Sequence, residues 1–459
     1  MMFKTKRRRN TFLNLVSWSG DKMSRFLVAG IVLIAFAGFS FGEALNWPTW
    51  RGPQSNGIAP KNAAPPVKWS EKTNIKWKVE LPGKGSSSPI IWGNDIFLTT
   101  AIKTDRIAKK DEQPKRNENF EAKTVPTANF YRFEILCFDK NTGKLKWNKI
   151  ANEAFPHEGH HSTHSYAAGS CVTDGKKLYV SFGSFGFYCF DLSGNLLWQR
   201  DFGRLTTRLG WGESVTPSLF NDSLVLNLDQ EINSKIVVLD CNTGKTKWEK
   251  ERDEKTTWNT PLIVTHLDKT QVILNGTNRV RSYNLADGAL IWETSGMTTN
   301  AIPSPISANG MAYVMSGYRG AAAIAIPLNS TGVLDTAEKV AWQYAKGTPY
   351  VPSPIINEDM LYFTKANAGI LTALDLKTGK PIFEEFRLEN TSTLYASPVI
   401  ANGMIYFMDR DGTTVVIKTG RKPEIIATNR INEAIDASPA ISGKTLFIRG
   451  EKHLFAIEE

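Results

Sequence analysis

Three stretches of the chain, ILCFDKNTGKLKW (135–147), IVVLDCNTGKTKW (236–248) and ALDLKTGKPIF (373–383), are copies of one phrase. Each copy joins an apolar strand to an Asp-x-x-Thr-Gly turn, and a second strand follows that ends in an aromatic residue. A proline opens most of the units, as at Pro217 and Pro261. The phrase returns at intervals of roughly forty to fifty residues, which is typical of a β-propeller.

The repeat predicts eight blades of four antiparallel strands in a single all-β domain over 74–459. The units begin near Ser86, Ser165, Ser214, Trp258, Ile302, Val351, Tyr395 and Asp436. The last unit reaches the C-terminus after three strands and would leave an unpaired edge. We expect NIKWKVEL (74–81), an alternating segment with no blade of its own, to be the missing outer strand that closes the ring.

The tryptophans that end the units are large enough to wedge between neighbouring blades, and the turn glycines supply the positive φ of a tight hairpin. We therefore expect a structural role for Trp77, Trp147, Trp198, Trp248, Trp292 and Trp342.

The N-terminal region predicts export. FLVAGIVLIAFAGFSF (26–41) is an uncharged apolar run preceded by Arg25, so we interpret 23–44 as a signal peptide and 1–22 as an upstream extension from a misassigned start. Residues 45–73 form a lead-in to the propeller. We expect a monomer in the periplasm or cell envelope. The alternative is an uncleaved signal, which would be the only link to the membrane.

The charge of the chain argues against a nucleic-acid partner. The formal net charge is +10, but seven basic residues and one acidic residue precede Phe26 and contribute most of it. The propeller itself lacks the basic balance that neutralising phosphates requires.

A histidine segment lies in a loop between the first two units, on the loop-rich face. The candidate metal ligands are His157, Glu158, His160, His161 and His164, with Asp229 and Glu231 on a neighbouring loop. This density of imidazoles suits zinc, copper or iron. The alternative is a loop in which the histidines only form hydrogen bonds and the two acidic residues are solvated. The His-Glu-x-x-His pattern of zinc proteases needs a helix, which Pro156 and Gly159 oppose.

A second cluster on the same face consists of Arg204, Arg208, Trp211 and Glu213, with Trp258 from the next loop. Bidentate arginine contacts and stacking on an indole suit an anionic or sugar-like ligand. A network of salt bridges between blades is the alternative. The charged insertion 103–128 is interpreted either as a flap over this mouth or as a solvated loop.

The Leu-Asp-x-x-Thr-Gly-x-x-x-Trp core resembles the pyrrolo-quinoline quinone (PQQ) type propeller repeat over about 69–459. Quinoprotein dehydrogenases share this repeat with the propeller lipoprotein of outer-membrane protein assembly. WPTWRGPQSNG (47–57), FPHEGHHSTHSYA (155–167) and FGSFGFYCFDLSGNLLW (182–198) are similar to an exported bacterial group of PQQ-like propellers with no assigned activity. The resemblance implies the fold and leaves the function open.

Two departures from these relatives shape the functional expectation. The dehydrogenases have adjacent cysteines beside the quinone, whereas Cys137, Cys171, Cys189 and Cys241 are all separate. The assembly lipoprotein has a lipidated N-terminal cysteine, which this chain lacks. We expect a non-catalytic scaffold that binds a protein or small ligand at its loop-rich face, without PQQ or another cofactor. The alternative is a metal- or quinone-dependent enzyme with the histidine segment at its centre.

Overall fold

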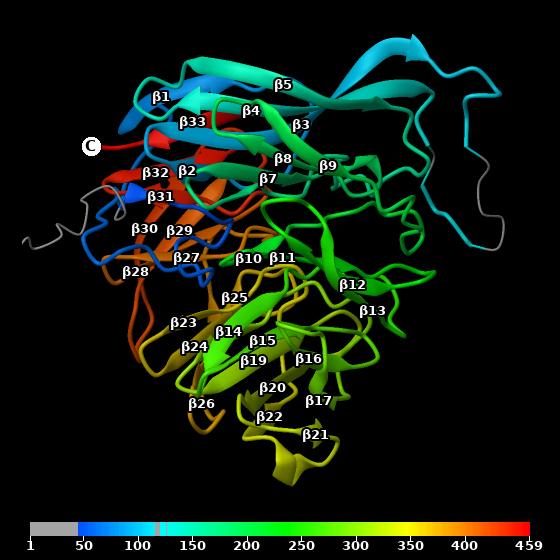
Figure 1. Cartoon of the computed structure of the whole chain (residues 1–459). Helices are drawn as coiled ribbons and strands as arrows, with labels where there is room; N and C mark the ends of the chain where they lie inside the picture. Colours follow the sequence, from blue (N-terminus) through cyan, green and yellow to red (C-terminus); the bar gives the residue numbers. More distant parts are fainter. Residues whose placement is uncertain (1–44, 115–119, 125) are drawn as a thin grey trace, which may run out of the picture. The chain divides into compact units, whose positions relative to one another are not determined.

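A computed structural model describes residues 45–114, 120–124 and 126–459 (Figure 1). The predicted extension 1–22 and signal peptide 23–44 lie outside these residues. Among the described residues, the helical elements are short 3₁₀ turns such as η2 (Gly183–Phe185) and η3 (Ala337–Lys339). In this part of the chain we find no helix with the length and apolarity needed to cross a membrane.

The strands form eight sheets, as predicted. Blade one comprises β2 (Ile90–Trp92), β3 (Asp95–Ile107), β4 (Asn129–Asp139) and β5 (Leu145–Ala154), and blade two β6 (Val172–Thr173), β7 (Lys177–Ser181), β8 (Phe187–Asp191) and β9 (Leu196–Arg200). Blade three comprises β10 (Ser218–Phe220), β11 (Ser223–Leu228), β12 (Lys235–Asp240) and β13 (Thr246–Glu251), and blade four β14 (Leu262–His266), β15 (Lys269–Leu274), β16 (Val280–Asn284), β17 (Leu290–Thr294) and the added β21 (Gly332–Val333).

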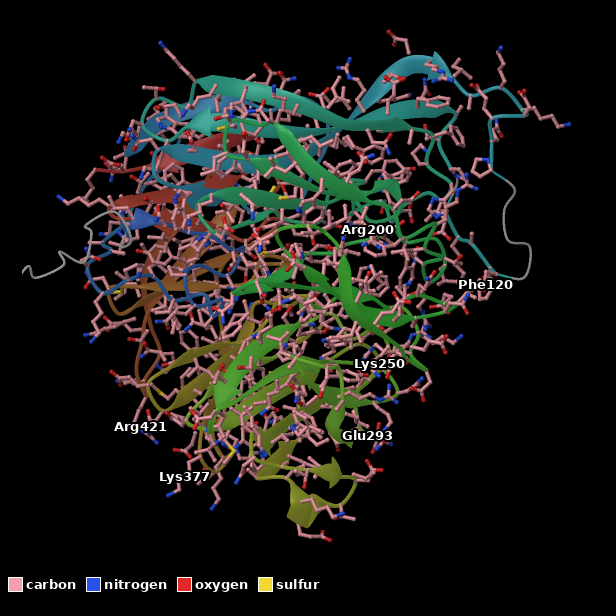
Figure 2. The ribbon with its side chains drawn as sticks, viewed as in Figure 1. Phe120, Arg200, Lys250, Glu293, Lys377 and Arg421 are labelled. Atoms are coloured by element: carbon pink, nitrogen blue, oxygen red, sulfur yellow. The ribbon has the colours of Figure 1, made fainter. Side chains whose placement is uncertain are left out.

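The second half of the ring repeats this order. Blade five comprises β18 (Ile306–Ala308), β19 (Met311–Ser316), β20 (Ala322–Pro327) and β22 (Trp342–Tyr344), and blade six β23 (Ile355–Asn357), β24 (Met360–Thr364), β25 (Ile370–Asp375) and β26 (Pro381–Arg387). Blade seven comprises β27 (Val399–Ala401), β28 (Met404–Met408), β29 (Thr413–Lys418) and β30 (Glu424–Arg430), and blade eight β31 (Ala440–Ser442), β32 (Thr445–Arg449), β33 (His453–Ile457) and β1 (Ile75–Glu80). Figure 2 shows Arg200, Lys250 and Glu293, on the outermost of the four repeat strands of blades two, three and four, one below another.

The predicted closure of the ring is confirmed. β1 pairs antiparallel with β33, with Lys78 opposite Phe455, and completes the sheet in the order β1-β33-β32-β31. Beyond the strand, the amide of Leu81 donates to the carbonyl of Lys452 at 2.7 Å. The first and last parts of the propeller are therefore joined by main-chain hydrogen bonds.

The lead-in segment is ordered against the turns that connect first and second strands. The amide of Gly93, in the turn of blade one, donates to Asn46, and that of Ala64 donates to the carbonyl of Gly443 in blade eight. The guanidinium of Arg51 donates to the carbonyls of Pro354 and Pro398. The lead-in therefore links several blades on the face opposite the loop-rich mouth.

The core lies between neighbouring blades. Tyr313 and Met315 of β19, for example, pack in one cluster with Leu361 and Phe363 of β24. The terminal tryptophans serve these seams as predicted: the indole N–H of Trp77 donates to the carbonyl of Lys140 at 3.1 Å, in the turn of the next blade. Trp198, Trp248 and Trp342 make the equivalent bonds to Cys241, Leu285 and Leu376.

Trp292 makes no such bond to the next blade, because that blade has no short Asp turn. The connection from β20 to β22 is an insertion, and its strand β21 pairs in parallel with β17, with Gly332 opposite Trp292. The buried indole of Trp292 donates instead to Gln271 of its own blade at 3.2 Å. The insertion thus adds a fifth strand to blade four.

Candidate functional site

The starts of the repeat units meet at a cavity of about 400 Å³ on the loop-rich face. It is lined by seven of the eight predicted unit starts, namely Ser86, Ser214, Trp258, Ile302, Val351, Tyr395 and Asp436. Trp211, Tyr318 and Tyr350 add three further aromatic rings. We call this cavity the mouth cup. Its volume lies in the range of small-molecule sites, about 300–1,000 Å³.

Five aromatic side chains form most of its apolar wall. Trp211 and Trp258 stack with ring centroids 6.4 Å apart, and Tyr318 and Tyr350 stack at 4.7 Å. The indole N–H of Trp258 donates to the carbonyl of Gly212 at 2.9 Å, which fixes its orientation. Because the rings support one another, the cup is preformed and offers surfaces for stacking.

The histidine segment forms part of the same wall through His161 and His164. Each of its four imidazoles contacts an oxygen atom. Three contact backbone carbonyls: His157 that of Leu205 at 2.7 Å, His160 that of His161 at 2.8 Å, and His164 that of Glu213 at 3.0 Å. His161 contacts the hydroxyl of Thr163 at 2.8 Å. Burial lowers the pKa of His164 to about 4 and also lowers the pKa values of His157 and His160. These three rings are therefore neutral at pH 7.

In the part of the chain that the structure describes, no group of three or more histidine, cysteine, aspartate or glutamate side chains is arranged to hold a metal ion. The histidines lie on one segment but use their ring nitrogens for local hydrogen bonds. The metal site remains a prediction. It would require these bonds to be exchanged for bonds to the metal.

Glu158 and Glu213 lie behind the wall of the cup. Glu213 accepts from the amide of Ser184 at 2.7 Å and from its hydroxyl at 2.5 Å, and Glu158 accepts from the hydroxyl of Thr207 at 2.8 Å. Loss of solvation raises the pKa of Glu213 to about 8. Together with His157 they line a cavity of about 20 Å³, room for a single water molecule. The side chains of Glu158 and Glu213 position the loops that form the cup.

Asp229 and Glu231 join neighbouring loops and do not line the cup. Asp229 is 6% exposed and pairs with Arg252 through contacts of 2.7 and 3.2 Å. Glu231 accepts from the hydroxyl of Thr256 at 2.8 Å. The solvated-loop interpretation is therefore wrong for Asp229, because a residue distant in sequence neutralises it.

The two arginines of the predicted ligand cluster lie at different places. Arg204 is exposed, whereas Arg208 is half-buried near Tyr350 of the cup. The amide of Arg208 donates to Thr256 at 2.9 Å, and its Nε lacks a hydrogen-bond partner among the described residues. Of the predicted ligand cluster, Trp211 and Trp258 line the cup itself.

The charged insertion begins inside blade one, because β3 continues to Ile107 and β4 starts at Asn129 (Figure 1). On its return, the amide of Lys123 donates to the carbonyl of Leu209 at 2.9 Å, and the hydroxyl of Thr124 donates to the carbonyl of Gly210 at 2.7 Å. The insertion therefore braces the loop that presents Trp211. Residues 115–119 and 125 lie outside the described part.

Tyr318, Tyr350 and Tyr395 were not predicted as site residues. Tyr395 is a unit start and Tyr350 directly precedes the unit start Val351, so the signal was the position of these residues within the repeat. Tyr318 follows β19, in a loop joining second and third strands, and no repeated phrase marks it.

Comparisons with known proteins support the fold. A comparison with curated proteins found no match. The crystal structure of BamB from Moraxella catarrhalis is similar with a TM-score of 0.57 and 12% identity, over 83% of this chain and 98% of that one. Quinohemoprotein alcohol dehydrogenase from Comamonas testosteroni is similar with a TM-score of 0.59 and 9% identity, over 90% and 80% of the two chains. At such identities the likeness shows the fold alone.

The family comparison is more specific. The model of the family described as outer membrane protein assembly factor BamB matches residues 131–385 and 304–459. The two matches together span well over half of the chain and include blades two to seven completely. The chain belongs to this PQQ-like propeller family, the family of outer membrane protein assembly factor BamB.

Proposed function

We propose that the protein is an exported propeller that binds a partner protein at its mouth cup and has no catalytic activity of its own. The observation that carries this proposal is the convergence of five aromatic side chains on one preformed cavity of about 400 Å³. Clustered tryptophan and tyrosine side chains in a concave site are the usual anchors of protein interfaces. The name of the family, an assembly factor, is consistent with a protein partner.

The chemistry of the wall supports binding more than reaction. His157, His160 and His164 have lowered pKa values, and each ring is held by a carbonyl oxygen. Glu213, whose pKa is raised, is engaged by Ser184 behind the wall. The polar groups thus stabilise the loops, and the aromatic faces are left for a ligand. A small ligand in the same cup is the nearest variant of the proposal.

Site-specific photo-cross-linking in cells tests this function. A benzophenone amino acid replaces Ile302, which lines the cup, and in a matched control it replaces Lys245, in the Asp turn of blade three on the opposite face. We expect a discrete protein adduct from position 302 and none of the same mass from position 245.

A second pair of variants ties the adduct to the aromatic wall. Trp211→Ala with Trp258→Ala should abolish the adduct, whereas Lys245→Ala should leave it unchanged. An adduct that survives the double substitution would show that the partner does not use the cup. Absence of any protein adduct at position 302 would favour the small-ligand variant, and native mass spectrometry of the purified protein would then reveal the bound mass.

A further inference from the structure

The mouth cup continues into a second, polar pocket of about 110 Å³ where blade eight meets blades one and two. We call it the seam pocket. It shares Ser86, Thr163, His164 and Asp436 with the cup, so a single ligand can reach both.

Arg449, the last residue of β32, lies in the wall of the seam pocket and is 2% exposed. Its Nη1 donates to the carbonyl and the hydroxyl of Ser87, at 3.1 and 2.5 Å. Among the described residues, neither its Nε nor its Nη2 has a hydrogen-bond acceptor, and no carboxylate forms an ion pair with it. Burying a charge without a partner is costly, because solvation is lost and nothing replaces it.

A second buried arginine shows what a purely structural role requires. Arg51 is also 2% exposed, and its Nε also lacks a partner among the described residues. Both of its terminal nitrogens donate, however, to the carbonyls of Pro398 at 2.9 Å, Asn56 at 3.1 Å and Pro354 at 2.7 Å. These bonds attach the lead-in to blades six and seven. Arg449 has acceptors from one residue only and faces a cavity. Its guanidinium is therefore incompletely satisfied by the protein.

The other charges of the seam pocket are already paired. Lys84 contacts Glu451 at 3.3 Å, and Arg410 contacts Asp436 at 2.5 Å. Burial lowers the pKa of Arg449 to about 9, and the side chain is still protonated at pH 7. The pocket thus carries one uncompensated positive charge.

The backbone and neighbouring hydroxyls also suit an oxyanion. Gly85 lacks a side chain where Nη2 of Arg449 passes, since a methyl group there would collide with that nitrogen. The hydroxyls of Ser86 and Ser165 lie 3.2 Å apart on the same wall. One of these two hydroxyls donates to the other, so an oxyanion in the pocket would find a guanidinium nitrogen and one free hydroxyl donor together, the combination that forms short charge-assisted hydrogen bonds.

We propose that the seam pocket binds the oxyanion group, a carboxylate or a phosphate, of the ligand that occupies the mouth cup, with Arg449 as its charge partner. This inference rests on the proposed function in that the anion belongs to the ligand of the cup. The bound ligand therefore combines a group that stacks on aromatic rings with an anionic group.

Thermal unfolding of the purified, otherwise intact protein tests the pocket with small anions. Sodium phosphate and sodium acetate are titrated separately at pH 7, with sodium chloride keeping the ionic strength constant. We expect one of them to raise the Tm along a logarithmic curve, by about 1–3 °C at tenfold above its Kd. A response to phosphate alone identifies a phosphate as the ligand group, and a response to acetate identifies a carboxylate.

Arg449→Met is the decisive variant, because it keeps the length of the side chain and removes the charge. We expect it to abolish the logarithmic response while its Tm in chloride stays equal to or above that of the unsubstituted protein. General salt exclusion raises the Tm of both proteins alike and without saturation. A response that persists in Arg449→Met overturns the proposal.

The test remains decisive if the variant does not fold, and it is independent of the aromatic site. If Arg449→Met fails to fold, the shape of the curve for the unsubstituted protein decides: a linear rise, or no rise for either anion, overturns the inference. Phosphate and acetate have no ring to stack in the cup, so a negative result leaves the aromatic site untouched. The cross-linking at position 302 tests that site separately.

Discussion

The two faces of the propeller use the repeat in opposite ways. On the face that carries the Asp-x-x-Thr-Gly turns, here called the turn face, equivalent residues form the same hydrogen bond in different blades. Asp139, Asp240 and Asp375 each accept from the amide three residues later at 2.8 Å. At the mouth, equivalent unit starts carry different side chains, among them Trp258 and Asp436. Identical residues at repeated positions mark structure, whereas different residues at repeated positions mark the candidate site.

The largest effect should come from breaking the ring itself. Deletion of 74–81 removes the strand that pairs with β33 and leaves an exposed edge on blade eight. We expect a loss of at least about 5 kcal/mol in the free energy of unfolding, since strand hydrogen bonds and the Trp77 seam are lost together. Denaturant unfolding followed by circular dichroism measures it. Lys76→Ala, which keeps the strand, should change stability by less than about 1 kcal/mol. A deletion variant as stable as that control would show that the ring closes without β1.

The next largest loss of stability should come from substituting a glycine on the turn face that packs against a tryptophan. A second glycine with a similar positive φ but no close neighbour is the control for backbone strain. Gly143 has φ +69°, and a methyl group there would lie 2.7 Å from Cε3 of Trp77. Gly93 has φ +59° with open space around it. We expect Gly143→Ala to cost about 2–4 kcal/mol and Gly93→Ala about 1 kcal/mol. Urea unfolding of both variants provides the comparison. Equal losses would mean that the tryptophan does not press on the turn.

At the mouth, Glu213 should make stability depend on pH. Its folded-state pKa of about 8 is above its unfolded value, so its contribution is fully present below about pH 4 and is lost as the pH rises towards 8. At pH 8.5 we expect the free energy of unfolding of Glu213→Gln to exceed that of the unsubstituted protein by at least about 1 kcal/mol. Denaturant unfolding of both proteins measures this difference. The difference should shrink at pH 5. A constant difference across this range would show that the carboxyl titrates normally.

The smallest effect concerns the turn carboxylates. Hydrogen bonds from Thr142 and Thr378 hold the pKa values of Asp139 and Asp375 below their usual range. Their contribution is present above about pH 4 and is lost as the pH falls through the lowered values. We expect Thr142→Val to lower stability at pH 7 by about 0.5–1 kcal/mol and to lessen the loss on acidification. An unchanged acid profile would contradict this role for the threonine.

The fold could be predicted from the sequence because the residues that form each turn are close together in the chain. An Asp-x-x-Thr-Gly turn and its tryptophan lie within nine residues of each other, and the unpaired last edge pointed to 74–81. The pairing of β21 with β17 could not be predicted, since two residues of strand carry no pattern.

Much of the candidate site could not be predicted from the sequence, because its residues come from loops of different blades and meet only in the closed ring. Tyr318 and Tyr350 become neighbours only when loops of successive blades meet, and Arg252 neutralises Asp229 from another loop. Trp211 and Trp258 were predicted because aromatic residues stood out among polar loop residues. Arg449 was missed, since nothing in β32 shows that its charge is left unpaired.

The measurement that tests the mouth cup most directly is ¹⁹F NMR of the protein labelled with 5-fluorotryptophan, with resonances assigned by single Trp→Phe variants. A cell-envelope extract is added in increasing amounts. We predict that the resonances of Trp211 and Trp258 shift or broaden, while those of Trp77, Trp198 and Trp248, which lie between blades, stay unchanged. Changes confined to these last three tryptophans, or no change at any position, would contradict this prediction.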